Sequence, residues 1–134
     1  MANGTIAFDT LQTSGQIQGT AKSVDTDYVV NGSARVWVNY DLNGTSAYRV
    51  SFNASSLTDN GTGDQTITIS TAMANATYSH TGMAGLGNTN LIAISQCQDT
   101  TAVTTTATRY QTCFSNGNLI DCTSINNSLF GDLA

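Results

Sequence analysis

Short stretches of the chain alternate apolar and polar residues, and turn-forming residues separate these stretches. Between residues 33 and 40, Val36 and Val38 fall on one face of an extended chain, while Arg35 and Trp37 fall on the other. A period of two residues is that of a β-strand with one buried face. The same reasoning predicts strands over the following ranges: 28–30, 33–40, 46–53, 65–71, 76–80, 91–95, 103–114 and 119–125.

Individual patterns add detail to this expectation. In the stretch 46–53, Tyr48, Val50 and Phe52 share one face. The first three predicted strands form an antiparallel meander over about 27–53. The stretch 76–80 is a candidate partner of 65–71, and the Gly-rich segment 82–88 is expected to be a loop.

The dipeptide Asn-Gly recurs between the predicted strands and is a strong hairpin signal, because both residues tolerate a positive φ. It occurs at Asn3-Gly4, Asn31-Gly32, Asn43-Gly44, Asn60-Gly61 and Asn116-Gly117. Short strands between such turns predict an all-β fold, a single antiparallel β-sandwich or jelly-roll-like domain. We expect this domain to span residues 26–134, and residues 1–25 to be an N-terminal arm or first strands and a candidate attachment segment.

Composition excludes several other classes of protein. Thr, Ser, Asn, Gln and Gly make up half of the 134 residues, and charged residues only 10%. Such residues form helices poorly, so a helical bundle is not expected. The net charge of −5, with four scattered basic side chains, argues against nucleic acid as a partner. No apolar run is long enough for a spanning helix and no signal peptide is visible, so membrane insertion is not expected.

The residues that could carry chemistry are few. His80 is the only histidine, and we interpret it as a strand-end side chain rather than a catalytic base. Cys97, Cys113 and Cys122 lack metal-ligand spacing and are expected to be small buried hydrophobes, with a Cys113–Cys122 disulfide as the alternative. The acidic turn 59–64 is interpreted as structural, with a weak cation site as the alternative. No enzyme, cofactor or metal site is therefore expected.

Aromatic residues gather near the first predicted hairpins, at Trp37, Tyr40 and Tyr48. Aromatic rings contribute large buried areas to cores and interfaces, and their faces can also stack on ligands. We favour packing in a core or a subunit interface. A sugar-stacking platform formed by these three residues is the alternative.

Four segments resemble a module of small virion structural or tail-fibre-like proteins of marine tailed bacteriophages. They are the stretches 27–39 (DYVVNGSARVWVN), 51–64 (SFNASSLTDNGTGD) and 72–78 (AMANATY), and the terminal Phe-Gly-Asp-Leu at 130–133. Many relatives carry Pro where this chain has Ala74, and residues 81–112 match nothing in the module. The resemblance implies a place in the virus particle and a homotrimeric assembly, and it supplies no catalytic residues.

The sequence therefore predicts a non-enzymatic virion structural protein, assembled in the host cytoplasm and contacting other capsid or tail proteins. Because no coiled-coil heptads or repetitive stalk are visible, we favour a capsid decoration or head fibre. The alternative is a tail-fibre or tail-tip subunit, or a glycan-binding module that contacts a host surface glycan. Trp37 and residues 81–112 would carry that recognition.

Overall fold

The protein is all-β, as the sequence predicts. The computed structural model describes residues 32–86, 93–97 and 103–134, and all strand pairings within them are antiparallel. The strands are β1 (Val36–Asp41), β2 (Ala47–Phe52), β3 (Ala54–Gly61), β4 (Asp64–Ile69), β5 (Ser79–Gly85), β6 (Ala93–Cys97), β7 (Ala107–Phe114) and β8 (Ser124–Phe130). The predicted strand 28–30 lies outside the described residues.

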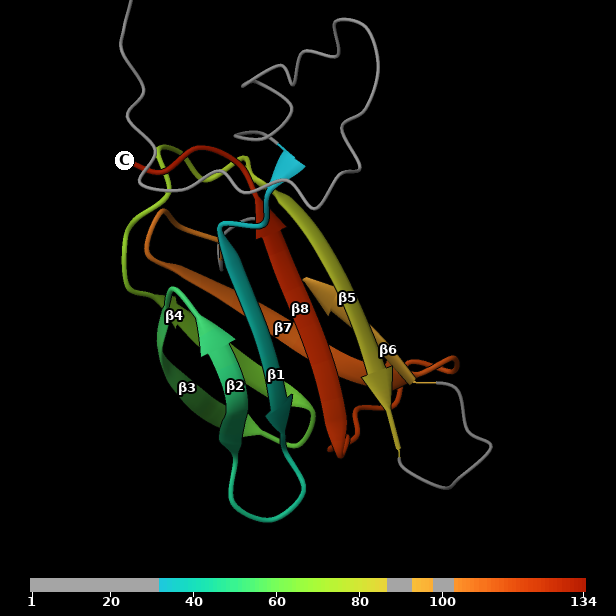
Figure 1. Cartoon of the computed structure of the whole chain (residues 1–134). Helices are drawn as coiled ribbons and strands as arrows, with labels where there is room; N and C mark the ends of the chain where they lie inside the picture. The colour runs from blue at the N-terminus through green and yellow to red at the C-terminus, as the bar shows by residue number, and fades with distance from the viewer. Residues whose placement is uncertain (1–31, 87–92, 98–102) are drawn as a thin grey trace, which may run out of the picture.

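The strands form one hydrogen-bonded sheet in the order β2-β1-β8-β5-β6-β7-β4-β3, which is folded over on itself. Figure 1 shows β2, β1, β8 and β5 as a front layer, with β6, β7, β4 and β3 behind it. The pair Ala84↔Ala93, between β5 and β6, joins the two layers. This arrangement is a β-sandwich. Its β8-β5-β6-β7 portion is a Greek key, whereas the jelly-roll part of the expectation is not confirmed.

The two end strands of the sheet, β2 and β3, follow each other in the chain and are separated by Asn53 alone. Asn53 has a φ of 54°, a left-handed conformation that Asn tolerates better than most residues. Its Nδ2 donates to the carbonyl oxygens of Arg35 and Thr71 at 3.1 and 3.2 Å, and its Oδ1 accepts from the Thr71 N–H at 2.7 Å. The side chain thus holds the point where the chain passes from the front layer to the back layer.

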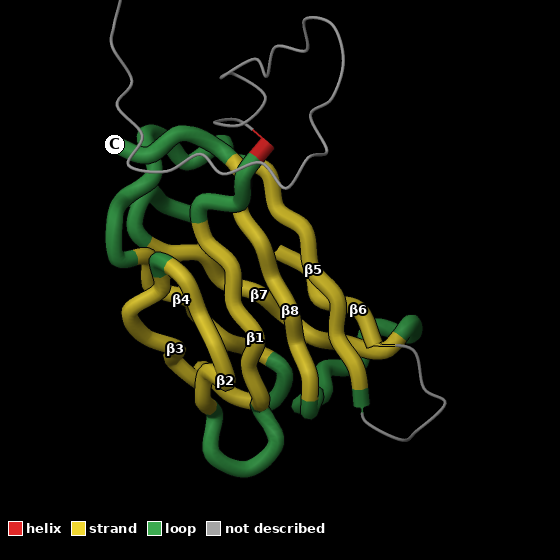
Figure 2. Tube along the Cα trace, viewed as in Figure 1, coloured by secondary structure: helices red, strands yellow, loops and turns green. Residues whose placement is uncertain are grey.

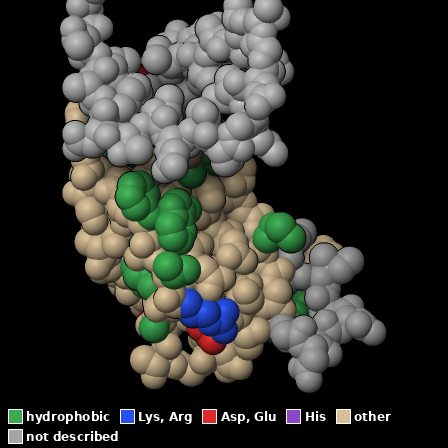
Figure 3. Space-filling model, viewed as in Figure 1, with side chains coloured by type: hydrophobic (Ala, Val, Ile, Leu, Met, Phe, Trp, Pro, Cys, Tyr) green, Lys and Arg blue, Asp and Glu red, His purple; other side chains and the backbone are tan. Residues whose placement is uncertain are grey.

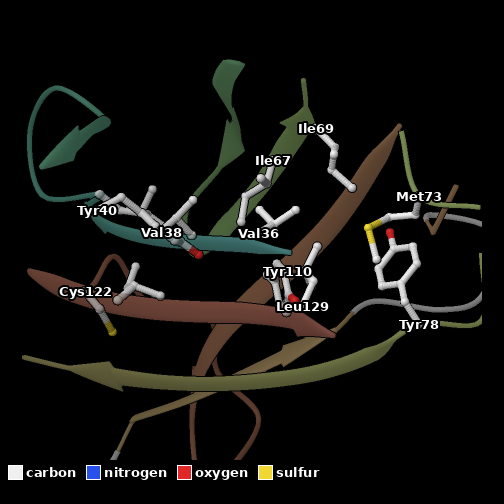
Figure 4. Packing of buried hydrophobic residues seen from close by; sticks show 12 residues of the cluster. Val36, Val38, Tyr40, Ile67, Ile69, Met73, Tyr78, Tyr110, Cys122 and Leu129 are labelled. Atoms are coloured by element: carbon white, nitrogen blue, oxygen red, sulfur yellow. The ribbon is translucent and has the colours of Figure 1, made fainter. Parts of the chain in front are cut away.

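The core lies between the layers (Figure 4). Val36, Val38 and Leu129 point inward from the front layer, and Ile67 and Tyr110 meet them from the back layer. This confirms the predicted inward face of β1. The complete buried apolar cluster is Val36, Val38, Tyr40, Leu42, Ile67, Ile69, Met73, Tyr78, Tyr110, Cys122, Ile125 and Leu129.

The connection between β4 and β5 closes one end of the sandwich together with the C-terminal residues. Met73 forms a bridge to Leu133, and the N–H of Ala74 donates to the carbonyl of Asp132 at 2.8 Å. Gly131 lies so close to Tyr78 that an added Cβ would be 2.8 Å from the Tyr78 Cβ. Two of the segments that carry the phage-like resemblance, 72–78 and 130–133, therefore pack on each other.

The Asn-Gly turns behave as predicted at two of the three described positions. Asn43-Gly44 lies in the β1–β2 hairpin, and Asn116-Gly117 turns the chain after β7. Figure 2 shows the β1–β2 loop at the end of the sandwich opposite the C-terminus. At the third position the hairpin loop is Thr62-Gly63, directly after Asn60-Gly61.

Several strand predictions were wrong in extent or pairing. Residues 82–85 belong to β5 rather than to a loop, and residues 79–85 pair with β8 and β6 instead of β4. The last strand begins at Ser124 rather than at 119 and crosses to the front layer to pair with β1 and β5. These pairings are non-local, and alternation within a segment carries no information about which distant strand lies beside it.

The predicted face of β2 is also only partly right, because a bulge interrupts its alternation. Asn39 pairs with Val50 and Tyr40 with Tyr48, which leaves Arg49 as the extra residue. A bulge of one residue exchanges the faces of a strand on either side of it. Tyr48 is therefore near the inward Tyr40, while Val50 and Phe52 are exposed.

Gly63 is the glycine whose replacement we expect to cost the most stability. It has a φ of 62°, and an added Cβ would lie 2.5 Å from the Thr112 carbonyl oxygen and 2.7 Å from the Ile120 nitrogen. Left-handed strain and overpacking together predict that Gly63→Ala lowers the free energy of unfolding by about 3 kcal/mol. Urea denaturation measures this loss.

Gly44→Ala is the matched control, because Gly44 has a φ of 87° but nothing within 4 Å of the added Cβ. Strain alone predicts a loss of about 1 kcal/mol there. Equal losses for the two variants would contradict the steric argument for Gly63.

Candidate functional site

The outer surface of the front layer carries an exposed apolar cluster over β1 and β2, which we call the Trp37 patch. It consists of Trp37, Val50 and Phe52, whose exposed fractions are 39%, 50% and 54%. Trp37 and Phe52 are paired across the two strands, and their rings stack with centroids 6.2 Å apart and planes 13° apart. Figure 3 shows hydrophobic side chains gathered over this part of the front layer. An exposed cluster of neighbouring apolar side chains is a candidate interaction surface.

Polar groups border the Trp37 patch. One row further along the sheet, Asn39 lies opposite Val50, and its Nδ2 donates to the Oδ1 of Asn126 on β8 at 2.7 Å. At the bulge, Arg49 and Asp41 form an ion pair at 2.8 Å. An apolar centre with a polar rim is the composition of protein interfaces.

The three aromatic residues singled out from the sequence do not form one platform. Trp37 is on the outer surface, whereas Tyr40 is completely buried. Tyr48 is partly buried beneath β2, and its hydroxyl donates to the carbonyl of Ser56 on β3 at 2.7 Å. Tyr40 and Tyr48 make an edge-to-face contact with ring centroids 6.3 Å apart. Both tyrosines therefore contribute to the packing between the two layers, which agrees with the interpretation favoured from the sequence, packing in a core.

Tyr40 belongs to a polar network inside the sandwich. Gln65 Nε2 donates to the Tyr40 hydroxyl at 2.8 Å, and that hydroxyl donates to Asn127 Oδ1 at 2.8 Å. Asn127 Nδ2 in turn donates to the Ser95 hydroxyl at 2.9 Å. The network links β4, β1, β8 and β6, and burial raises the pKa of the Tyr40 hydroxyl above its usual range. Buried polar groups that bond to one another in this way help to specify one packing of the layers.

The carboxylates of the 59–64 turn are engaged in structural contacts. Asp64 accepts two hydrogen bonds of 2.6 Å from Arg109 on β7, one at each carboxylate oxygen. Asp59 accepts from the Gly61 N–H at 2.9 Å and from the Ser46 hydroxyl at 2.8 Å. This use of the oxygens supports the structural interpretation. Within the described ranges, no three His, Cys, Asp or Glu side chains are grouped to hold a metal ion.

His80, Cys113 and Cys122 lie within the packed structure. The His80 ring nitrogen Nδ1 is 2.8 Å from the Tyr110 hydroxyl, and burial lowers the pKa of the imidazole. Cys113 and Cys122 are buried and not joined by a disulfide. The side chain of Cys97 lies outside the described part of the structure.

The sequence predicts the Trp37 patch only in part. It singles out Trp37 as a candidate aromatic residue but does not group Val50 and Phe52 with it. Counting outward from a two-residue Asn43-Gly44 turn places Trp37 opposite Val50. The observed loop begins the pairing at Asp41↔Ala47, and with the bulge at Arg49 it places Trp37 opposite Phe52. Only the observed register shows which side chain the indole ring meets.

Comparisons with known proteins add no assignment. The chain matches no protein-family model, no curated protein and no solved structure. In the described part of the chain, no helix has the length and apolar character of a membrane span.

The Asp64–Arg109 pair predicts how stability depends on pH. The Arg109 guanidinium holds the pKa of Asp64 below its ordinary value of 3.8. The folded state therefore binds fewer protons than the unfolded chain in this range. The contribution of the pair is complete above about pH 4 and is lost as the pH falls through the lower folded pKa.

Asp64→Asn and Arg109→Gln test this dependence by urea denaturation at several pH values. Asp64→Asn should be about 1 to 2 kcal/mol less stable than the wild type near neutral pH, because it removes a charge-assisted hydrogen-bonded pair. Arg109→Gln should also be less stable, because it leaves the Asp64 carboxylate without its guanidinium partner. Each should also lose less stability on acidification. Acid profiles parallel to that of the wild type would contradict the assignment.

Proposed function

We propose that the protein is a non-enzymatic structural component of a bacteriophage particle, a β-rich knob on the particle surface. The observation that carries the proposal is the Trp37 patch, in which three exposed apolar side chains lie together on β1 and β2. The resemblance of residues 27–39, 51–64, 72–78 and 130–133 to phage structural proteins supports the location. The patch supplies the attachment surface for another virion protein.

A capsid decoration or head fibre is the favoured position within this proposal. Short Thr, Ser and Asn side chains keep a β surface soluble with few charges, and they lose little conformational entropy when they become ordered at a contact. The patch contains no charged side chain, so attachment through it depends on shape and apolar burial.

Imaging of purified particles with a labelled antibody tests the structural proposal. We expect the label at many symmetric positions over the head. Label confined to the tail would favour the tail-fibre alternative. Absence of the protein from the particle would refute the structural function.

A tail-tip or glycan-binding role is the second candidate, and the accessible indole ring of Trp37 favours it. An aromatic face can stack on the apolar face of a sugar, and the side-chain amides of Asn39 and Asn126 lie in the next row of the sheet. In this role the same patch would contact a host surface glycan rather than another virion protein.

Trp37→Ala distinguishes the two roles. The side chain is partly exposed on the outer surface, so the variant should fold, and its melting temperature provides the check. Under the structural function, particles should carry fewer copies of the variant, as measured by quantitative mass spectrometry. Under the glycan function, the copy number should be unchanged while adsorption to host cells falls.

Met83→Ala is the matched control, because Met83 is an exposed apolar residue on β5 outside the patch. It should leave copy number and adsorption at wild-type values. Unchanged copy number and adsorption in a folded Trp37→Ala variant would exclude the patch from both roles.

A further inference from the structure

The loop between β1 and β2 carries a reactive pair that the proposed function does not use, Asn43-Gly44. We propose that Asn43 is a site of spontaneous deamidation, through a succinimide formed with the backbone nitrogen of Gly44. Among the Asn-Gly pairs in the described residues, the structure leaves this one open to the reaction and restrains the other two.

The reaction needs only the chain and water. The Gly44 nitrogen attacks Cγ of Asn43 and forms a new C–N bond, and the bond from Cγ to Nδ2 breaks. Nδ2 leaves as ammonia, taking up the proton that the Gly44 nitrogen loses. One water molecule then opens the five-membered ring at either carbonyl, which yields aspartate or isoaspartate at position 43.

The hairpin leaves both reacting groups free. Asn43 and Gly44 are exposed, and nothing lies within 4 Å of the position where a Gly44 Cβ would be. The backbone N–H of Asn43 donates to Asp41 Oδ1 at 2.8 Å, which involves neither reacting group. Among the residues that the structure describes, the Asn43 side-chain amide and the Gly44 N–H have no hydrogen-bond partner.

At Asn60-Gly61 both reacting groups are held. Asn60 Nδ2 donates to Thr66 Oγ1 at 2.9 Å and to Asp64 Oδ1 at 3.3 Å. The attacking group, the Gly61 N–H, donates to Asp59 Oδ1 at 2.9 Å. Asn60 is exposed, as Asn43 is, so these hydrogen bonds rather than solvent access distinguish the two sites.

At Asn116-Gly117 the same two groups are also occupied. Asn116 Oδ1 accepts from the Asn118 N–H at 3.0 Å, which restrains the rotation of the side chain. The Gly117 N–H donates to the Phe114 carbonyl at 2.9 Å. Reaction at either restrained site first requires these hydrogen bonds to break.

Deamidation at Asn43 would change the charge of the front layer. It adds a carboxylate two residues from Asp41, whose side chain pairs with Arg49. The isoaspartate product also lengthens the backbone of the hairpin loop by one atom. The site therefore gives the protein an age-dependent negative charge in the loop that follows β1, the strand that carries Trp37.

Incubation of the folded protein in mildly alkaline buffer, followed by peptide mass spectrometry, tests the proposal. We expect position 43 to deamidate first, with isoaspartate detected by enzymatic methylation. Positions 60 and 116 should react at least about tenfold more slowly. A hydrogen bond whose net free energy is about 1.4 kcal/mol must first break, and a barrier higher by that amount slows the reaction about tenfold. Equal rates at the three positions, or faster reaction at 60 or 116, would overturn the proposal.

Two controls separate the effect of structure from that of sequence. In denaturant the three described Asn-Gly pairs should react at similar rates, because the hydrogen bonds are absent. Gly44→Ala should slow the reaction at position 43 alone, because its methyl group crowds the attacking nitrogen. An unmodified Asn43 in the folded protein, after a time that modifies it fully in denaturant, would also refute the proposal.

Discussion

The structure depends on one constraint: a single antiparallel sheet must bury one of its faces against itself. The sheet does so by folding into two layers, which brings its two end strands, β2 and β3, together at Asn53. The side chain of Asn53 forms hydrogen bonds to the backbone of Arg35, just before β1, and of Thr71, just after β4. These hydrogen bonds connect the bend between the layers to a strand end in each layer. Pairing β5 with β6 joins the two layers on the opposite side, so β2 and β3 are the edge strands of the sheet.

The interior combines apolar packing with a small polar network. Valine, isoleucine, leucine and tyrosine side chains fill most of the space, while Tyr40, Gln65 and Asn127 bond to one another across the layers. The apolar residues supply the driving force for burial, and the hydrogen bonds among Tyr40, Gln65 and Asn127 favour this relative position of the layers, although the buried Gln65 Oε1 has no partner among the described residues. Among the described residues most aromatic rings are buried or half-buried, which makes the exposed Trp37 and Phe52 rings the distinctive feature of the front layer.

Local patterns correctly predicted the all-β class, the inward face of β1 and the hairpin at Asn43-Gly44. They failed where a non-local contact decides the outcome. Residues 82–85 have few strand-forming side chains, yet they form β5 because β8 pairs along their whole length. Similarly, Tyr40 looked available for ligand stacking, but its strand places it opposite Gln65 in the core.

The sequence by itself determined the class of fold, because a two-residue apolar period and frequent positive-φ turns permit little else. It also determined which residues could carry chemistry, since composition limits the candidates. Only the tertiary structure decided how these residues are grouped: the bulge at Arg49 turns Phe52 outward to stack on Trp37, and Arg109 occupies the carboxylate of Asp64. Register and the pairing of distant strands set these contacts, and both depend on the whole sheet closing around its core.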